Sequence, residues 1–263
     1  MINYRFRGPR DSLALAQTAL QQWFSGTFGQ YLLSQEQALI GGLLRQCYGQ
    51  TLIQLSSDNN SELYSESRLV RNFALSCYQH NNQSRHLAVT ELESLPIATE
   101  SVDVVVLHHV LEFSNHPHQI IREVQRILSP HGKIIVVGIN PNSFLGFQSL
   151  VKGVGVSDRV KASPISLSRL DDWLHLLGFG TPKQRYDCYE PPLNNRWLLE
   201  RFMFLGQIAA RFQLIGGGIY ILESVKEVTR LTPISPKIHF GRVFDLPVFG
   251  SAATTKAANK KIH

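Results

Sequence analysis

Residues 91–140 decide the fold of this chain and read ELESLPIATESVDVVVLHHVLEFSNHPHQIIREVQRILSPHGKIIVVGIN. After a polar loop at 91–97, the apolar run at 102–107 has the length of a buried strand, and residues 117–128 place apolar side chains at helical spacing. A Ser-Pro-His-Gly turn separates this helix from a second apolar run at 133–138. A strand, a helix and a second strand at this spacing predict a βαβ unit, which builds a parallel sheet with helices on both faces.

The carboxyl ends of these two predicted strands indicate where a ligand site is expected. In open parallel sheets, ligands bind in the crevice outside those ends. The first strand runs into His108 and His109, and the second ends at Asn140. We therefore expect function at these three residues, with a strand-exit turn as the alternative role for Asn140.

The composition is typical of one enlarged globular α/β domain. The chain has 263 residues, of which 43% are hydrophobic and 17% charged, so it is long enough to bury a full core. Cys47, Cys77 and Cys188 form no C-x-x-C pair, which argues against a disulfide framework and a zinc site and favours a reducing cytoplasm. The first residues do not resemble a secretory signal, and no run reaches the roughly 18 apolar residues of a membrane-spanning helix.

Positive charge is concentrated toward the C-terminus. From Lys226 onward the only acids are Glu227 and Asp245, so this part holds most of the net charge of +6. Such a tail can contact a nucleic acid or an anionic membrane surface weakly, although a solvated terminus has the same composition. The last ten residues lack the aromatic side chains of a nucleic-acid groove, which favours the solvated terminus.

The rest of the chain predicts further alternating elements. Helices are expected at 12–24 and, more weakly, at 61–70. Two more are expected to begin at the capping boxes Ser34-Gln35-Glu36-Gln37 and Ser168-Arg169-Leu170-Asp171. Gly178 is placed to end the last of these helices. Strands are expected at 51–55, 72–77, 87–90, 186–189 and 219–225. A long apolar helix at 194–214 is inserted between the final two strands. Core packing is its expected role, with an apolar substrate or a membrane surface as the alternative contact.

Three segments of the central stretch carry a family resemblance. ELESLPI at 91–97, SVDVVV at 101–106 and RILSPHGK at 126–133 are similar to the Asp-Ala-x-x-Leu-Pro-Phe loop, the Ser-Phe-Asp strand start and the Arg-Val-Leu-Lys-Pro-Gly-Gly turn of class I S-adenosylmethionine-dependent methyltransferases, most closely the quinone-biosynthesis group. Segments such as 28–33 and 217–220 also resemble a bacterial branch of predicted methyltransferases. The resemblance implies S-adenosylmethionine as cofactor and a small, possibly hydrophobic, methyl acceptor.

The predicted elements, the charge distribution and the resemblance together give a domain plan. Residues 49–228 would form a Rossmann-like sheet of seven strands, mostly parallel with one antiparallel edge strand and with helices on both faces. Residues 1–48 would form an N-terminal helical cap, and residues 229–263 a basic strap and tail.

The glycine loop of the family is altered in this chain. The family's Asp-x-Gly-x-Gly-x-Gly loop falls on QLSSDNN at 54–60, so Ser56, Asp58 and Asn60 stand where the family has glycine. Glycine lets the backbone approach the cofactor and adopt positive φ, and Asn and Asp tolerate that conformation best among the other residues. The resemblance therefore implies less room for the methionine part of the cofactor. It places cofactor contacts at Gln54, Leu55, Ser56, Ser57 and Asp58.

Further cofactor contacts are implied at the ends of the later strands. The ribose-binding carboxylate of the family falls at Ser76, beside Cys77. One serine hydroxyl replaces two charge-assisted hydrogen bonds there, which predicts weaker cofactor binding. Glu91 keeps an acidic acceptor at the adenine position, where the Leu92 N–H can donate, and Leu107 lies at the end of the neighbouring strand.

Methyl transfer is an in-line displacement that needs alignment more than a fixed catalytic residue. For an acceptor that must lose a proton, His109 or His108 is the expected general base, with a hydrogen-bonded structural role as the alternative for each. Because neighbouring strand residues point to opposite faces, we expect at most one of them to face the cofactor. His116, His118 and His131 lack metal-ligand spacing, so no metal is expected.

Two other functions remain open from the sequence. A catalytically inactive module that binds a protein or nucleic-acid partner would explain Ser56, Asp58, Asn60 and Ser76. Glu91 and the intact 103–133 block favour an enzyme instead. A nicotinamide-dependent dehydrogenase is disfavoured because no G-x-G-x-x-G follows a strand. The sequence does not indicate the oligomeric state.

Overall fold

A computed structural model describes residues 20–57, 62–76, 87–89, 92–147, 163–190 and 216–227 of the chain. For Ser76 and residues 87–89 it describes the backbone alone. The chain divides into two units, Met1–Val228 and Thr229–His263, and the second unit lies outside the described residues. The predicted helix at 194–214 lies outside them as well.

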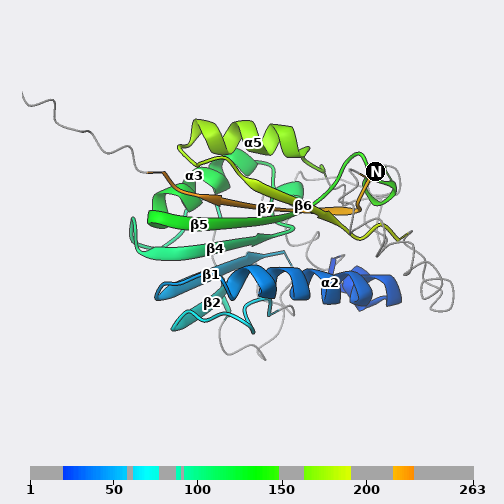
Figure 1. Cartoon of the computed structure of the whole chain (residues 1–263), viewed down its shortest axis with the longest axis horizontal. Coiled ribbons are helices and arrows are strands. Elements are labelled where there is room, and N and C mark those ends of the chain that lie inside the picture. The colour runs from blue at the N-terminus through cyan, green and yellow to red at the C-terminus, as the bar shows by residue number, and fades with distance from the viewer. Residues whose placement is uncertain are drawn as a thin grey trace, which may run out of the picture. The chain divides into compact units, whose positions relative to one another are not determined.

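The first unit is built on a seven-stranded sheet in the order β3-β2-β1-β4-β5-β7-β6 (Figure 1). The strands are β1 Thr51–Ser56, β2 Arg71–Ser76, β3 Leu87–Val89, β4 Val102–His108, β5 Leu128–Ile139, β6 Lys183–Asp187 and β7 Ile219–Val225. All neighbours are parallel except β7, which is antiparallel to both β5 and β6. The predicted, mostly parallel sheet of seven strands is confirmed. Its antiparallel strand lies one place inside the edge, which is formed by β6.

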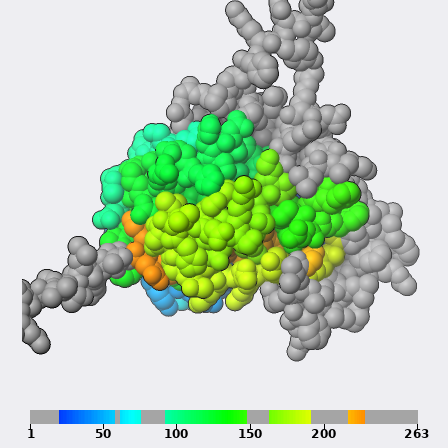
Figure 2. Space-filling model, turned by 90° about the horizontal axis from the view of Figure 1, so that it is seen from above, coloured from blue at the N-terminus to red at the C-terminus, as the bar shows by residue number. Residues whose placement is uncertain are grey.

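Alternate strand residues build a separate core on each face of the sheet. The helices are α2 Thr27–Leu44, α3 Pro117–Ile127 and α5 Leu167–Leu176, with a 3-10 turn, η1, at Leu111–Phe113. Ile53 and Val105 pack in the core that holds the buried side chains of α3 and α5, whereas Leu52 and Val104 pack with those of α2. Figure 1 shows α2 on the side opposite to α3 and α5, and Figure 2 views the face that α3 and α5 cover. The two-residue period of the strands therefore places helices on both faces.

Both predicted capping boxes are wrong. α2 begins at Thr27, so Ser34 lies inside the helix, where its Oγ donates to the Tyr31 carbonyl oxygen 2.6 Å away. α5 begins at Leu167 after Ser166, so Ser168 also lies inside its helix. Burial of Phe28 and Leu32 extends α2 toward its N-terminus, because packing of an apolar face contributes more to helix stability than a cap signal does. None of the described helices has both the length and the apolar character to cross a bilayer.

The weak helix predicted at 61–70 is wrong for its described part. Residues 62–70 form turns, and the first of these is fixed by Gln54, whose Oε1 accepts a hydrogen bond from the Leu63 N–H at 3.0 Å. Leu63 is buried in the core on the α2 side of the sheet. A side-chain bond to the backbone competes with helical hydrogen bonding, which explains the turn.

The turn predicted at 129–132 forms the irregular start of β5. His131 has a φ of +63°, and the register between β4 and β5 shifts between Val102 and Val104. A Cβ at Gly132 would lie 2.9 Å from the Ser129 carbonyl oxygen, so this position has no room for a side chain. The family-like Ser-Pro-His-Gly sequence therefore shapes the entry into β5.

Asp103 joins the amino ends of neighbouring strands. Its Oδ2 accepts hydrogen bonds from the backbone N–H groups of Gln50 at 2.7 Å and Thr51 at 3.1 Å. Its Oδ1 accepts a bond from Ser129 Oγ at 3.1 Å. The carboxylate thus links the entries into β1 and β5 to β4, at the end of the sheet opposite to His108.

Candidate functional site

The strand order reverses direction at β1 and β4. From this point β2 and β3 follow on one side, and β5, β7 and β6 on the other. Such a switch point is where ligands bind in open α/β sheets, at the carboxyl ends of the strands. Ser56 and His108 end the two strands and are register partners. The predicted site therefore lies at the switch point of the sheet.

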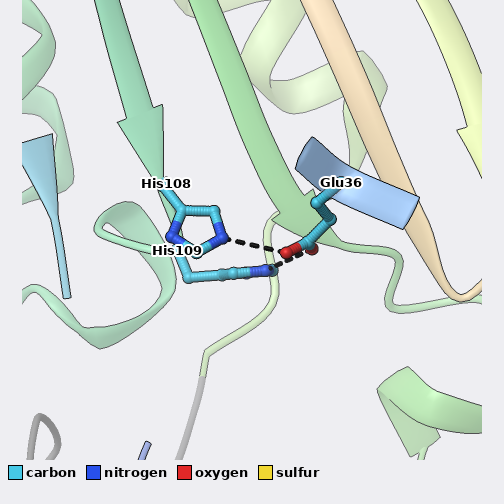
Figure 3. Close-up of side chains that lie close together, drawn as sticks. All are labelled: Glu36, His108 and His109. Atoms are coloured by element: carbon cyan, nitrogen blue, oxygen red, sulfur yellow. Dashed lines mark hydrogen bonds and ion pairs between the residues drawn. The ribbon is translucent and has the colours of Figure 1, made fainter. Parts of the chain in front are cut away.

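Both strand-end histidines contact Glu36 of α2 (Figure 3). His108 Nε2 lies 2.9 Å from Glu36 Oε2, and His109 Nε2 lies 2.8 Å from Glu36 Oε1. The side chains of Glu36 and His108 are completely buried, and that of His109 is 2% exposed. One carboxylate thus connects α2 to two consecutive imidazoles at the end of β4.

The backbone leaves strand geometry at His109. Its φ is +49°, in the left-handed region that residues other than glycine seldom adopt, and its N–H donates to the Val137 carbonyl oxygen at 3.1 Å. Because the strand ends at His108, the two side chains need not alternate. Both side chains reach Glu36, so the alternation expected for continued strand geometry does not extend to His109.

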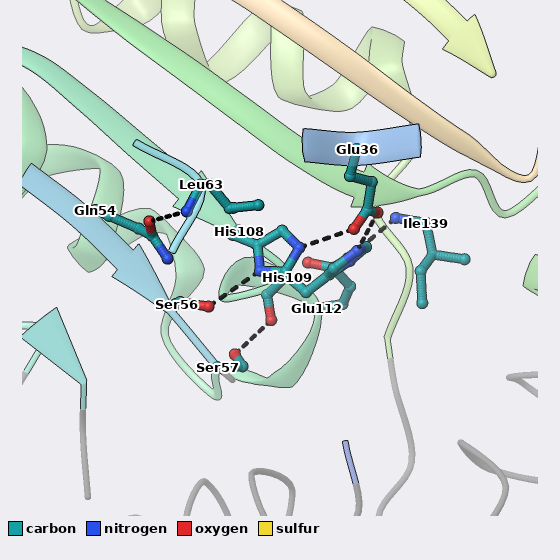
Figure 4. A network of polar contacts seen from close by, with 9 residues as sticks. All are labelled: Glu36, Gln54, Ser56, Ser57, Leu63, His108, His109, Glu112 and Ile139. Carbon is teal, nitrogen blue, oxygen red and sulfur yellow. Dashed lines mark hydrogen bonds and ion pairs between the residues drawn. The ribbon is translucent and has the colours of Figure 1, made fainter. Parts of the chain in front are cut away.

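Each outer nitrogen of the two imidazoles also has a partner (Figure 4). His108 Nδ1 lies 3.0 Å from Ser56 Oγ, and His109 Nδ1 lies 2.8 Å from Glu112 Oε1. The same Glu112 oxygen accepts a bond from the Ile139 N–H at 3.0 Å. The Phe24 ring covers both imidazoles, with centroids 5.8 Å from each. The four charged or titratable side chains form a closed, buried network.

The network is an ion pair at neutral pH. Burial alone would raise the pKa of Glu36, but the charges of His109 and His108 and their hydrogen bonds lower it to about 2. Burial alone would lower the pKa of His109, but the Glu36 charge and hydrogen bonds to Glu112 and Glu36 raise it to about 10. A general base must accept a proton, whereas His109 in this arrangement already holds one.

Among the predicted cofactor contacts, three leucines belong to the hydrophobic core. Leu55, Leu92 and Leu107 are buried together in the cluster on the α3 and α5 side of the sheet. Gln54 is 1% exposed and holds the Leu63 turn. Contact of these residues with a cofactor stays a prediction.

The two serines at the end of β1 bond to the end of β4. Ser56 contacts the His108 ring, while the Ser57 N–H donates to the His108 carbonyl oxygen at 3.2 Å and Ser57 Oγ donates to the His109 carbonyl oxygen. Ser76 ends β2, where its backbone pairs with Val89. Asp58, Cys77 and Glu91 lie outside the described residues.

The structure separates the other predicted site residues from this network. Glu36, His108 and His109 form the group of described side chains close enough to share one metal ion. His116, His118 and His131 are exposed and do not join it, and the His118 ring packs against the Trp173 ring in a tilted arrangement. Asn140 donates from Nδ2 to the Gly217 carbonyl oxygen at 2.9 Å, and its Oδ1 accepts from the Asn142 N–H at 3.1 Å. These contacts fit a strand-exit turn at Asn140, and its contact with a substrate stays a prediction.

Sequence reasoning missed the two carboxylates of the network. Glu36 was expected in a capping box, yet it lies between the buried Leu32 and Ile40 on one face of α2. An acid four residues from apolar side chains on both sides was the available signal, since buried acids need partners. Glu112 follows His109 by three residues in η1, a turn that was not predicted.

The family comparison supports a methyltransferase domain. Residues 67–136 match the family described as a methyltransferase domain. The uncharacterized protein YafS of Escherichia coli is 39% identical over 85 residues, which cover 32% of this chain and 35% of that protein. A malonyl-[acyl-carrier protein] O-methyltransferase of Methylovorus sp. is 27% identical over 112 residues, covering 40% and 36%. The chain spans about a third of the length of these curated relatives.

The comparison with solved structures concerns the fold. A SAM-dependent methyltransferase from Archaeoglobus fulgidus superimposes with a TM-score of 0.52 at 13% identity. The match covers 72% of this chain and 94% of the archaeal one. At this identity the likeness shows the shared fold alone.

Proposed function

We propose, from the premise that the chain belongs to the class I methyltransferases, that it transfers a methyl group from S-adenosylmethionine to a small acceptor. The observation that carries the proposal is the order β3-β2-β1-β4-β5-β7-β6 with β7 reversed, together with the methyltransferase-domain match at 67–136. The order creates the switch point at β1 and β4. Polar residues end both strands there, as a site for a nucleoside cofactor requires.

At the methionine end, the described residues leave less room for this cofactor than a glycine loop would, and the residues proposed for its adenosine end lie mostly outside the described part of the chain. Ser56 stands where the family has the first loop glycine, and its 3% exposed side chain fills the space beside His108. The proposed contacts with the cofactor therefore come chiefly from the positions that follow, Asp58, Ser76, Cys77, Glu91 and Leu92. Binding weaker than that of a glycine-loop enzyme follows from this assignment.

The loop that follows Glu91 is held rigidly against α3, which supports its role at the adenine. Arg126 donates from Nη2 to the Leu95 carbonyl oxygen at 3.0 Å and from Nη1 to the Ile97 carbonyl oxygen at 2.9 Å. Glu123 Oε2 accepts from the Leu95 N–H at 3.2 Å. Because hydrogen bonds already fix carbonyl and amide groups of this loop, little conformational entropy is lost when the loop binds a ligand.

The buried network restricts the acceptor. When bound, S-adenosylmethionine supplies an electrophilic methyl group, and the chain has to orient the acceptor in line with it. His109 holds its proton, and both imidazoles have all ring nitrogens occupied. We therefore propose that the histidines position the end of β4 and that the acceptor is nucleophilic without losing a proton to them.

Calorimetric titration of the purified chain with S-adenosylmethionine and S-adenosylhomocysteine tests the proposal. We expect both to bind, and Glu91→Ala to weaken binding by about 10-fold or more, because a hydrogen bond to a charged group contributes about 1.5–3 kcal/mol. Glu93→Ala, two residues along the same loop, is the matched control and should bind as the wild type does. Absence of heat with either ligand at millimolar concentration would overturn the proposal and favour the non-catalytic module.

A further inference from the structure

The network of Glu36, His108 and His109 contains one histidine more than a buried ion pair requires. Two imidazoles point their Nε2 atoms at the two oxygens of one carboxylate, and all three side chains are removed from water (Figure 3). A single histidine and a single acid would suffice for a buried ion pair. Once His109 releases its proton, two imidazole nitrogens and one carboxylate oxygen are instead a common ligand set for a transition metal.

The geometry points to a site for a divalent first-row transition-metal ion, held by His108 Nε2, His109 Nε2 and a carboxylate oxygen of Glu36. One ligand atom from each residue lies within 4.8 Å of the others, and the two imidazole–carboxylate separations are 2.8 and 2.9 Å. In the tetrahedral geometry usual for zinc, metal bonds of about 2.0–2.2 Å place neighbouring ligand atoms about 3.4 Å apart. An ion can therefore take the place of the histidine hydrogens once the carboxylate and imidazole atoms move apart by roughly 0.5 Å.

Groups behind the imidazoles orient them as in known metal sites. His109 Nδ1 bonds to the Glu112 carboxylate at 2.8 Å, and His108 Nδ1 contacts Ser56 Oγ at 3.0 Å. Metal-binding histidines nearly always have such a partner on the second nitrogen, which fixes the ring and leaves the other nitrogen for the ion. Glu112 is itself fixed by the Ile139 N–H. Both rings are thus aligned before any ion enters.

The ligand set selects the class of ion. Imidazole suits zinc, copper, iron and nickel, whereas magnesium and calcium prefer oxygen ligands. Three protein ligands leave at least one coordination position to water or another small donor. Such an ion would join α2 to the end of β4 at the switch point, so it would stabilise the wall of the proposed cofactor site. The inference does not depend on methyl transfer.

The test uses the full chain without a histidine tag, stripped with a chelator and then dialysed. Titration with Zn²⁺ by calorimetry should give one ion per chain, Co²⁺ should give visible d–d absorption, and Mg²⁺ should give neither signal. Glu36→Gln should weaken Zn²⁺ binding by about 100-fold or more, and Glu112→Gln by about 10–100-fold. His118→Gln, which alters an exposed histidine on α3, should leave the affinity unchanged.

X-ray absorption of the wild-type chain with one equivalent of Zn²⁺ tests the inference even if the variants do not fold. We expect two imidazole nitrogens and at least one oxygen around the ion. Absence of stoichiometric binding, a coordination shell without two imidazoles, or an affinity that Glu36→Gln does not change would overturn the inference and leave a metal-free ion-pair network. Titrating the chain with S-adenosylhomocysteine, with and without Zn²⁺, measures cofactor binding by itself. A failure of the metal inference can then be told from a failure of the proposed function.

Discussion

His109 shows how one residue changes what the end of a strand can do. With φ at +49°, it turns its ring to the same carboxylate that His108 contacts. The conformation costs about 1–2 kcal/mol in a residue with a Cβ. Its backbone bond to Val137 and its two carboxylate partners offset this cost.

Removing the shared carboxylate should destabilise the fold. In the metal-free protein, Glu36→Gln leaves the buried His109 cation with Glu112 as its remaining anionic partner. Breaking one side of a buried ion pair costs about 3–5 kcal/mol, so we expect a loss of this order in the free energy of unfolding by urea. Ser34→Ala on the exposed side of α2 is the control and should change stability by less than about 0.5 kcal/mol. An unchanged urea midpoint for Glu36→Gln would contradict the ion-pair assignment.

The same pair predicts how stability depends on pH in the metal-free protein. The pKa of His109 is raised from 6.5 to about 10, so its contribution is complete below pH 6.5 and is lost as the pH rises toward 10. The pKa of Glu36 is lowered from 4.5 to about 2, so its contribution is complete above pH 4.5 and is lost as the pH falls toward 2. The pair therefore stabilises the fold most between pH 4.5 and 6.5.

Urea midpoints measured across this range for the wild type and Glu36→Gln check the prediction. The groups that act on the pair are His108 of β4, Glu112 of η1 and Asp187 of β6. The difference between the two proteins should be largest on the plateau and shrink on both sides. A constant difference from pH 3 to pH 10 would mean that other groups control the profile.

At the residue scale, the sequence identified half of the network. His108 and His109 were predicted because they follow an apolar strand, which is a local signal. Glu36 lies far from them in the chain, and its contact with them depends on how α2 crosses the sheet. No local pattern contains that information. Glu112 was missed because η1 is a single short turn.

At the scale of elements, Gly178 at the end of α5 allows a test of how positive φ affects stability. Gly178 has a φ of +79°, its N–H donates to the His175 carbonyl oxygen, and a Cβ there would come no closer than 3.9 Å to a described neighbour. Gly178→Ala should therefore cost about 1 kcal/mol through backbone strain alone.

Gly216→Ala is the matched control for this prediction. Gly216 has no positive φ in the range that strains other residues, and a Cβ there would meet no atom of the described residues within 4 Å. We expect its free energy of unfolding to stay within about 0.5 kcal/mol of the wild type. Equal losses in the two variants, measured by urea unfolding, would argue against αL strain at Gly178.

Strands were predicted more accurately than helix starts. The strand at 219–225 coincides with β7, and the strands at 51–55 and 102–107 each extend by one residue in the structure. Apolar runs of this kind occur because the strands are buried on both faces, so they can be recognised in the sequence itself. The start of α2 and the turn at 62–70 depend instead on tertiary contacts of Phe28, Leu32 and Gln54, which local cap signals do not contain.

At the scale of the whole molecule, the order of the strands determines where chemistry can occur. The βαβ pattern at 91–140 and the family resemblance together predicted a parallel sheet whose strands end at one edge. The sheet places β1 and β4 side by side, so the carboxyl ends of strands separated by about 50 residues meet at the switch point. What the sequence could not supply is the closure of this edge by α2, because helix packing depends on the complete sheet.

A crystal structure of the chain with S-adenosylhomocysteine tests the central claim most directly. The account predicts the nucleoside at the carboxyl ends of β1 and β2, next to Glu91 and Leu92, with Ser56 still in contact with His108. Soaked crystals in which that edge holds no ligand at millimolar S-adenosylhomocysteine, or in which the ligand binds elsewhere on the molecule, would contradict it.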